Sequence, residues 1–92
     1  MGYLYILLCE KNRFYVGSTT DLERRIRQHK NGEGANFTKK YKPQKLVYHE
    51  CFPTIGMAFR REKQIQNWSR KKKDALIESQ KEELKRASKK RF

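Results

Sequence analysis

Residues 3–17 decide the fold: they read Tyr-Leu-Tyr-Ile-Leu-Leu-Cys at 3–9, Glu-Lys-Asn-Arg at 10–13 and Phe-Tyr-Val-Gly at 14–17. The first run is aliphatic, aromatic or Cys throughout, which predicts a strand covered on both faces. The polar run predicts a short turn, and the third run predicts a second strand ending at Gly17. The chain therefore opens with a predicted β-hairpin.

Helices, one further strand and a loop are expected along the rest of the chain. Their ranges are 20–31, 53–67 and 69–77 for the helices, 45–52 for the strand and 32–44 for the loop. Thr20 and Glu23 have the spacing of a capping box, so the first helix is expected to begin there and to stop at Gly32. Ser69 is expected to cap the third helix, which should extend through Ile77.

Size and charge limit the possible classes of protein. The chain has 92 residues and a formal charge of +13, from 23 Lys and Arg against 10 Asp and Glu. One domain is expected, without a signal peptide, and the apolar run at 3–9 is far shorter than the ~20 residues of a transmembrane helix. We expect a cytoplasmic protein whose excess charge serves nucleic acid. An anionic membrane surface and a merely solvated basic surface are the alternatives.

The two cysteines predict no disulfide. Cys9 and Cys51 lie in apolar runs without CxxC spacing, which indicates free, buried thiols in a reducing compartment. The alternative is a zinc site in which both cysteines converge with His29 and His49.

Two of the predicted helices carry a charged residue at or beside the apolar face. The two faces comprise Leu22, Ile26 and His29 on the first helix and Ile55, Ala58 and Ile65 on the second. Arg25 lies beside the first face and Glu62 lies inside the second. An Arg25–Glu62 ion pair that only specifies packing is one interpretation. The other is that both groups border a cleft, where one carboxylate suits one hard divalent cation completed by water and substrate phosphate.

Tyrosines stand in both strands of the predicted hairpin. Tyr5 belongs to one face of the first strand, and Tyr15 shares a face of the second strand with Gly17. Taken alone, aromatic residues in strands are ordinary core filling. A glycine at a strand end usually indicates a tight bend or a close backbone approach.

Together these residues resemble the GIY-YIG nuclease family. The two elements that name the family correspond to residues 3–5 and 15–17. Ser18 and a helix start come next, then Arg25 eight residues after the glycine, and Glu62 on the following helix. Each element alone is weak, but their order is specific, and the chain looks most like the small stand-alone bacterial members.

The resemblance covers residues 2–77 and implies an α+β fold. We expect a three-stranded antiparallel sheet flanked by about three helices, forming one domain over residues 1–77. Residues 78–92 are rich in charge, and we expect them to form a helical or disordered C-terminal tail.

The resemblance also implies hydrolysis of DNA phosphodiesters with one divalent ion, Mg²⁺ or Mn²⁺. By this resemblance, Glu62 would bind the metal and Arg25 would stabilise negative charge on the phosphate. Tyr5 or Tyr15 would position or deprotonate the attacking water, and His29 would make a proton-transfer or phosphate contact. Gly17 and Ser18 would support the site structurally. Metal and guanidinium charge suit this chemistry. A tyrosine with a pKa near ~10 is a poor base unless its surroundings lower that value. A structural role in the core is the alternative for His29.

Basic clusters predict contacts with a nucleic-acid backbone. The residues are Lys39, Lys40, Lys42, Arg70, Lys71 and Lys72, the first three interleaved with Phe37 and Tyr41. Such contacts give affinity and salt sensitivity but little sequence preference. We expect DNA as the partner, with RNA as an alternative, a monomeric chain, and a partner protein where a specific target is needed.

Three functions remain open from the sequence. The first is a metal-dependent DNA endonuclease of low intrinsic sequence specificity, with structure selectivity and a role in repair or recombination as refinements. The second is a catalytically weak or silent nucleic-acid-binding module with the same fold. The third is a basic accessory protein on a ribonucleoprotein or membrane surface, which accounts for the charge but for none of the inward polar residues.

Overall fold

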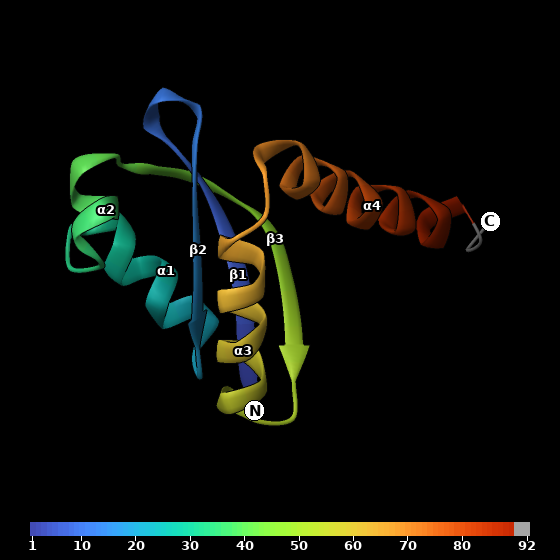
Figure 1. Ribbon diagram of the computed structural model, residues 1–92, viewed down its shortest axis with the longest axis horizontal. Coiled ribbons are helices and arrows are strands. Elements are labelled where there is room, and N and C mark those ends of the chain that lie inside the picture. The colour runs from blue at the N-terminus through green and yellow to red at the C-terminus, as the bar shows by residue number, and fades with distance from the viewer. Residues whose placement is uncertain (90–92) are drawn as a thin grey trace.

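The computed structural model describes the backbone of residues 1–89 and the side chains of residues 1–85. Its elements are β1 (Gly2–Cys9), a 3₁₀ turn η1 (Glu10–Asn12), β2 (Arg13–Thr19), α1 (Leu22–Lys30), α2 (Asn36–Lys40), β3 (Pro43–Phe52), α3 (Ile55–Gln66) and α4 (Arg70–Lys89). The strands form an antiparallel sheet in the order β2-β1-β3 (Figure 1). The predicted α+β class and three-stranded sheet are confirmed.

The central strand β1 is buried on both faces, as its apolar run predicted. Leu4 and Ile6 pack on one face with residues of α3 and α4, including Ile65 and Ile77. Tyr5, Leu7 and Cys9 pack on the opposite face, where their neighbours are Tyr15, Leu22, Ile26, Phe37, Tyr41 and Leu46. The sheet is thus covered by α1 and α2 on one side and by α3 and α4 on the other.

The turn between β1 and β2 is held from outside the hairpin. Lys11 and Asn12 both have positive φ values of 59° and 58°, a conformation that asparagine tolerates better than lysine. The guanidinium of Arg70 in α4 donates to the carbonyl and to Oδ1 of Asn12 and lies 3.7 Å from the centre of the Phe14 ring. Arg70 therefore ties the start of α4 to the hairpin.

The predicted capping box at Thr20 is wrong. The cap of α1 is Asp21, whose Oδ1 accepts from the backbone N–H of Arg24 at 3.2 Å. Thr19 explains the difference, because its Oγ1 lies 3.2 Å from the Asp21 N–H and sets the entry into the helix one residue later. An aspartate also suits the positive end of the helix. Ser69 caps α4 as predicted, since its Oγ accepts from the N–H of residue 72.

The loop expected over 32–44 is wrong in part. Residues 36–40 form α2, and β3 begins at Pro43. A single helical turn is too short to show a period of 3.6 residues. Its stability comes from tertiary packing, in which Phe37 joins the α1 side of the core and Thr38 is buried.

Helix α4 continues past Ile77, where the third helix was expected to end. Residues 78–89 are helical, one of the two states foreseen for the tail, and Figure 1 shows this part of α4 extending away from the sheet. Residues 90–92 lie outside the described part. Within residues 1–89, none of the helices is both long and apolar enough to cross a membrane.

Two expectations of burial are wrong. Cys9 is buried, but Cys51 is exposed. Cys51 lies in the edge strand β3, where alternate side chains face solvent. Ile55, placed on the apolar face of α3 by its periodicity, is 41% exposed because it is the first residue of that helix.

Glutamine side chains bond the backbone of both edge strands. Gln80 of α4 donates Nε2–H to the His49 carbonyl of β3 at 2.7 Å, and its Oε1 accepts the His49 N–H at 3.4 Å. Gln66 of α3 donates to the Val16 carbonyl of β2 at 3.3 Å. Backbone groups that an edge strand would leave unpaired are satisfied at these points.

Candidate active site

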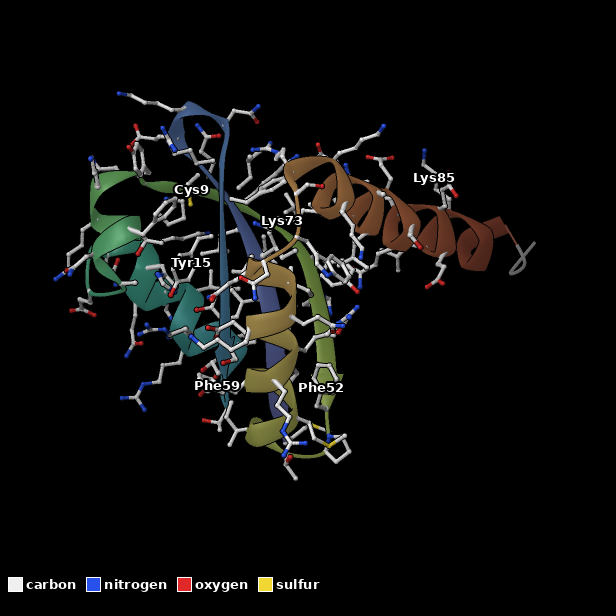
Figure 2. All side chains as sticks on the ribbon, in the orientation of Figure 1. Cys9, Tyr15, Phe52, Phe59, Lys73 and Lys85 are labelled. Carbon is white, nitrogen blue, oxygen red and sulfur yellow. The ribbon has the colours of Figure 1, made fainter. Side chains whose placement is uncertain are left out.

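Two tyrosines from adjacent strands meet above Gly17. Tyr5 of β1 pairs in register with Gly17 of β2, and the ring centres of Tyr5 and Tyr15 lie 6.2 Å apart. A Cβ atom at Gly17 would lie 2.6 Å from the Tyr5 Oη and 2.9 Å from Cε2 of Tyr15. Gly17 thus provides the space that the rings occupy. Figure 2 shows Tyr15 on the side of β2 that faces α1 and α2.

A buried chain of hydrogen bonds leads away from Tyr5. The Tyr5 Oη lies 2.8 Å from Nε2 of His29, and Nδ1 of His29 lies 2.7 Å from Oγ1 of Thr38. His29 is 1% exposed. Burial, with a smaller contribution from the charge of Arg25, lowers the pKa of His29 to about 4. The imidazole is therefore neutral at pH 7.

Arg25 of α1 supplies the positive charge of the site. Its Nη1 donates to Oε1 of Gln28 at 3.1 Å. Burial raises the pKa of Tyr5 and of Tyr15, while the charge of Arg25 opposes the rise and the charge of Glu62 adds to it. Both tyrosines are protonated at neutral pH, so neither is a base without help from a bound ligand.

Glu62 approaches from the other face of the sheet. Its Oε1 accepts from the Ser18 hydroxyl at 2.7 Å, and its Oε2 accepts from Nε2 of Gln66 at 2.9 Å. The Glu62 side chain is 12% exposed, and the nearest cation, Nζ of Lys63, is 4.0 Å away. Arg25 and Glu62 do not pair among the described residues. The interpretation as a packing ion pair is wrong.

Arg25 and Glu62 approach the same edge of the sheet from opposite faces because β2 is an edge strand. Ser18 reaches Glu62 on the α3 face and Tyr15 packs on the α1 face, so groups from both faces border the same edge. A groove of about 430 Å³ runs beside them. It is lined by residues 18–21, by Arg24, Arg25 and Gln28 of α1, and by Ile55 of α3. Arg25 and Ser18 connect the groove to the tyrosines and to Glu62.

The donor set suits one hard cation. Within residues 1–85, no group of three or more His, Cys, Asp or Glu side chains comes together, so the zinc alternative lacks its ligands. A lone carboxylate is compatible with Mg²⁺ or Mn²⁺, because Mg²⁺ keeps several waters and binds through one or two carboxylates and substrate phosphates. Glu62 is the residue that fits this description.

The predicted nucleic-acid contacts lie around the β1–β2 turn. Figure 1 shows α2 and the start of α4 on either side of this hairpin end. Lys39, Lys40, Lys42 and Lys71 are exposed there. Lys72 lies with its Nζ 4.2 Å from the centre of the Trp68 ring. The guanidinium of Arg70 is engaged with the hairpin and lies 3.5 Å from Asp74, so its charge is shared within the fold.

No sequence pattern marked Thr38 as part of the site. It stands in a segment without clear periodicity, between an aromatic residue and two lysines. Its burial and its bond to His29 appear only once α2 packs on the sheet. Thr38 is thus a candidate site residue that sequence alone does not reveal.

The arrangement corresponds to a known class of protein. The sequence profile of the GIY-YIG catalytic domain matches residues 1–75. The chain therefore belongs to the GIY-YIG nuclease family, and this membership indicates a nucleic-acid partner.

Among individual relatives, the similar chains are UPF0213 proteins. The one from Bacillus pumilus is 43% identical over 83% of this chain and 78% of its own length. UPF0213 protein HQ_3675A from Haloquadratum walsbyi is 46% identical over 83% of this chain and 85% of its own. The solution NMR structure of UPF0213 protein BH0048 from Bacillus halodurans matches with a TM-score of 0.54 and 40% identity, covering 85% of this chain and 84% of the other.

Replacing Gly17 tests the close approach of the two tyrosines. Gly17→Ala should lower the free energy of unfolding by about 2 kcal/mol or more, because a Cβ there overlaps the Tyr5 ring. The matched control is Gly56→Ala in α3, where a Cβ meets nothing nearer than 3.9 Å. It should be neutral or raise stability by up to about 1 kcal/mol. Urea denaturation measures both; equal stability of the two variants contradicts this account.

The neutral state of His29 has a pH signature. In NMR titration, the ring protons of His29 should shift with a midpoint near about 4. The unfolded chain binds this proton from about pH 6.5 downward, so the free energy of unfolding should fall between pH 6.5 and about 4, by at most about 3 kcal/mol. His29→Gln should flatten that part of the stability profile and identify the resonance. A His29 midpoint near 6.5 would refute the assignment.

Proposed function

We propose that this protein is a metal-dependent endonuclease that hydrolyses DNA phosphodiesters. The observation that carries the proposal is the meeting of Arg25, Glu62 and the Tyr5–His29 pair at one edge of the sheet, beside an open groove. A merely structural role leaves unexplained why an arginine and a glutamate border the same edge without pairing. Both charges are available to a substrate and its metal.

Glu62 would hold the divalent ion, Mg²⁺ or Mn²⁺, with water and a substrate phosphate as its other ligands. The bound ion supplies positive charge to the phosphate oxygens. Ser18 and Gln66 donate to the two carboxylate oxygens and so orient Glu62. These contacts suit a carboxylate that must keep one orientation beside the groove, which Ser18 lines.

Arg25 would stabilise negative charge that develops on the attacked phosphate. Gln28 accepts a hydrogen bond from the guanidinium, and both residues line the groove. Because the guanidinium is fixed before the substrate arrives, it needs little reorganisation during the reaction. An arginine also offers paired N–H donors to phosphate oxygens.

Tyr5 would act on the attacking water with His29 behind it. As the water oxygen bonds to phosphorus and the phosphorus–oxygen bond to the leaving group breaks, a proton passes from the water to the Tyr5 Oη. The proton of Tyr5 passes in turn to Nε2 of His29, 2.8 Å away. Tyr15 would support this pair, because its ring centre packs 5.0 Å from that of His29.

The substrate would bind mainly through its backbone. The exposed lysines of α2 and the start of α4 would contact phosphates, giving low sequence preference. We further propose that the protein acts on particular DNA structures during repair or recombination. It would act in the cytoplasm as a monomer, and a partner protein would supply any specific target.

The second candidate is a nucleic-acid-binding module with little or no turnover. The observation in its favour is electrostatic: burial raises the pKa of Tyr5 and lowers that of His29, so moving a proton between them is costly in the free protein. Turnover then depends on the charge that metal and phosphate bring.

Cleavage of supercoiled plasmid and branched DNA tests the proposed activity. With Mg²⁺ or Mn²⁺ the protein should nick DNA, and EDTA should abolish nicking until the metal is restored. Glu62→Gln and Arg25→Ala should each lower the rate by about 100-fold or more, because each removes charge that stabilises the transition state.

Matched controls come from exposed positions on the same or a neighbouring helix. Glu83→Gln on α4 and Arg27→Ala on α1 remove the same kinds of group at exposed positions that do not line the groove, and they should leave the rate within about 3-fold. Cutting that survives both site substitutions would show that a contaminant is responsible. Binding without cutting under every condition would favour the second candidate.

The lysines of α2 should govern the salt dependence of DNA binding. Lys39→Ala combined with Lys40→Ala should reduce the slope of log K against log salt by about 2, since each phosphate contact contributes about 0.9. Filter binding to duplex DNA between low and moderate salt measures the slope. Lys81→Ala is the control, because that ammonium lies 3.4 Å from Glu78 and is partly neutralised already. An unchanged slope in the double variant would remove α2 from the binding surface.

A further inference from the structure

The hydrogen bond between His29 and Thr38 determines which ring nitrogen carries the proton. Oγ1 of Thr38 lies 2.7 Å from Nδ1 of His29 and donates to the Ala35 carbonyl at 2.9 Å. A threonine hydroxyl has one proton, and a carbonyl oxygen only accepts. With the hydroxyl proton in the bond to Ala35, the Thr38 oxygen presents its lone pairs to the imidazole, and Nδ1 of His29 is the donor in that arrangement.

The other ring nitrogen is consequently free to accept. A neutral imidazole carries one N–H, so protonation at Nδ1 leaves Nε2 with a lone pair. Nε2 faces the Tyr5 Oη at 2.8 Å, and the tyrosine is the only partner in that bond with a proton to give. Every hydrogen bond from Tyr5 through His29 and Thr38 to Ala35 thus runs in one direction.

Gly34 lies against the same edge of the imidazole that Thr38 contacts. A Cβ at Gly34 would lie 2.2 Å from Nδ1 and 2.8 Å from Cε1 of His29. The backbone at Gly34 therefore lies against the imidazole, and Thr38 is itself 1% exposed. Together they enclose the Nδ1 edge of His29 and leave the ring little room to rotate.

We propose that Thr38 is a positioning residue that holds His29 in the Nδ1–H tautomer, with Nε2 open toward Tyr5. The inference deepens the proposed function and rests on it for its consequence in catalysis. In the opposite tautomer, Nε2–H would point at Tyr5, and the tyrosine would have no acceptor for its proton. The inward side of α2 therefore sets the direction in which a proton leaves the site.

Two substitutions at Thr38 separate this role from simple packing. Thr38→Val keeps the shape and removes the acceptor, whereas Thr38→Ser keeps the hydroxyl and removes a methyl group. Long-range ¹H–¹⁵N spectra at neutral pH report which nitrogen of His29 is protonated. The wild type and Thr38→Ser should show protonated Nδ1, and Thr38→Val should shift the population toward protonated Nε2. The nicking rate of Thr38→Val should fall about 10-fold to 100-fold, with Thr38→Ser close to wild type.

The outcomes distinguish this inference from the proposed function. Protonated Nε2 in the wild type overturns it without any variant, so the test holds even if Thr38→Val fails to fold. An unchanged tautomer and rate in a folded Thr38→Val also overturn it. If the wild type cuts no DNA, the nuclease proposal fails, while the spectra still decide whether Thr38 sets the tautomer of His29.

Discussion

The empty side-chain position at Gly17 is the constraint on which the site depends. Any Cβ there would collide with the ring and hydroxyl of Tyr5. Because the position is vacant, Tyr5 reaches across β2 to the edge of the sheet, where Arg25 arrives from one face and Glu62 from the other. A sheet normally separates the groups on its two faces; at Gly17 the edge strand has no side chain, so groups from both faces approach the same edge.

Burial and charge divide the site into two kinds of group. Tyr5 and His29 are buried and neutral, because desolvation raises the pKa of one and lowers that of the other. Arg25 and Glu62 border solvent and keep charges that do not neutralise each other within the described residues. The neutral pair suits proton movement, and the separated charges suit a phosphate and its metal ion. The division follows from the depth at which each side chain lies.

The parts predictable from sequence are those with a repeating signal. An apolar run predicted the doubly covered strand β1, and helical periodicity placed Arg25 beside one apolar face and Glu62 within another. Features decided by one contact or by topology were missed. Helix α2 is too short to show a period, Asp21 replaces Thr20 as the cap because of a bond from Thr19, and the exposure of Cys51 depends on β3 being an edge strand. Thr38 left no trace in sequence, because its role exists only through His29.

The glutamines that bond β2 and β3 have a consequence for association between chains. An exposed strand edge is a template onto which a foreign strand can add, the first step toward aggregation. Gln80 occupies both backbone groups of His49, and Gln66 occupies the carbonyl of Val16. An incoming strand must displace a side-chain amide at either edge before it forms a ladder. Both edges of this small, strongly basic protein's sheet therefore carry a side-chain obstacle to the addition of a foreign strand.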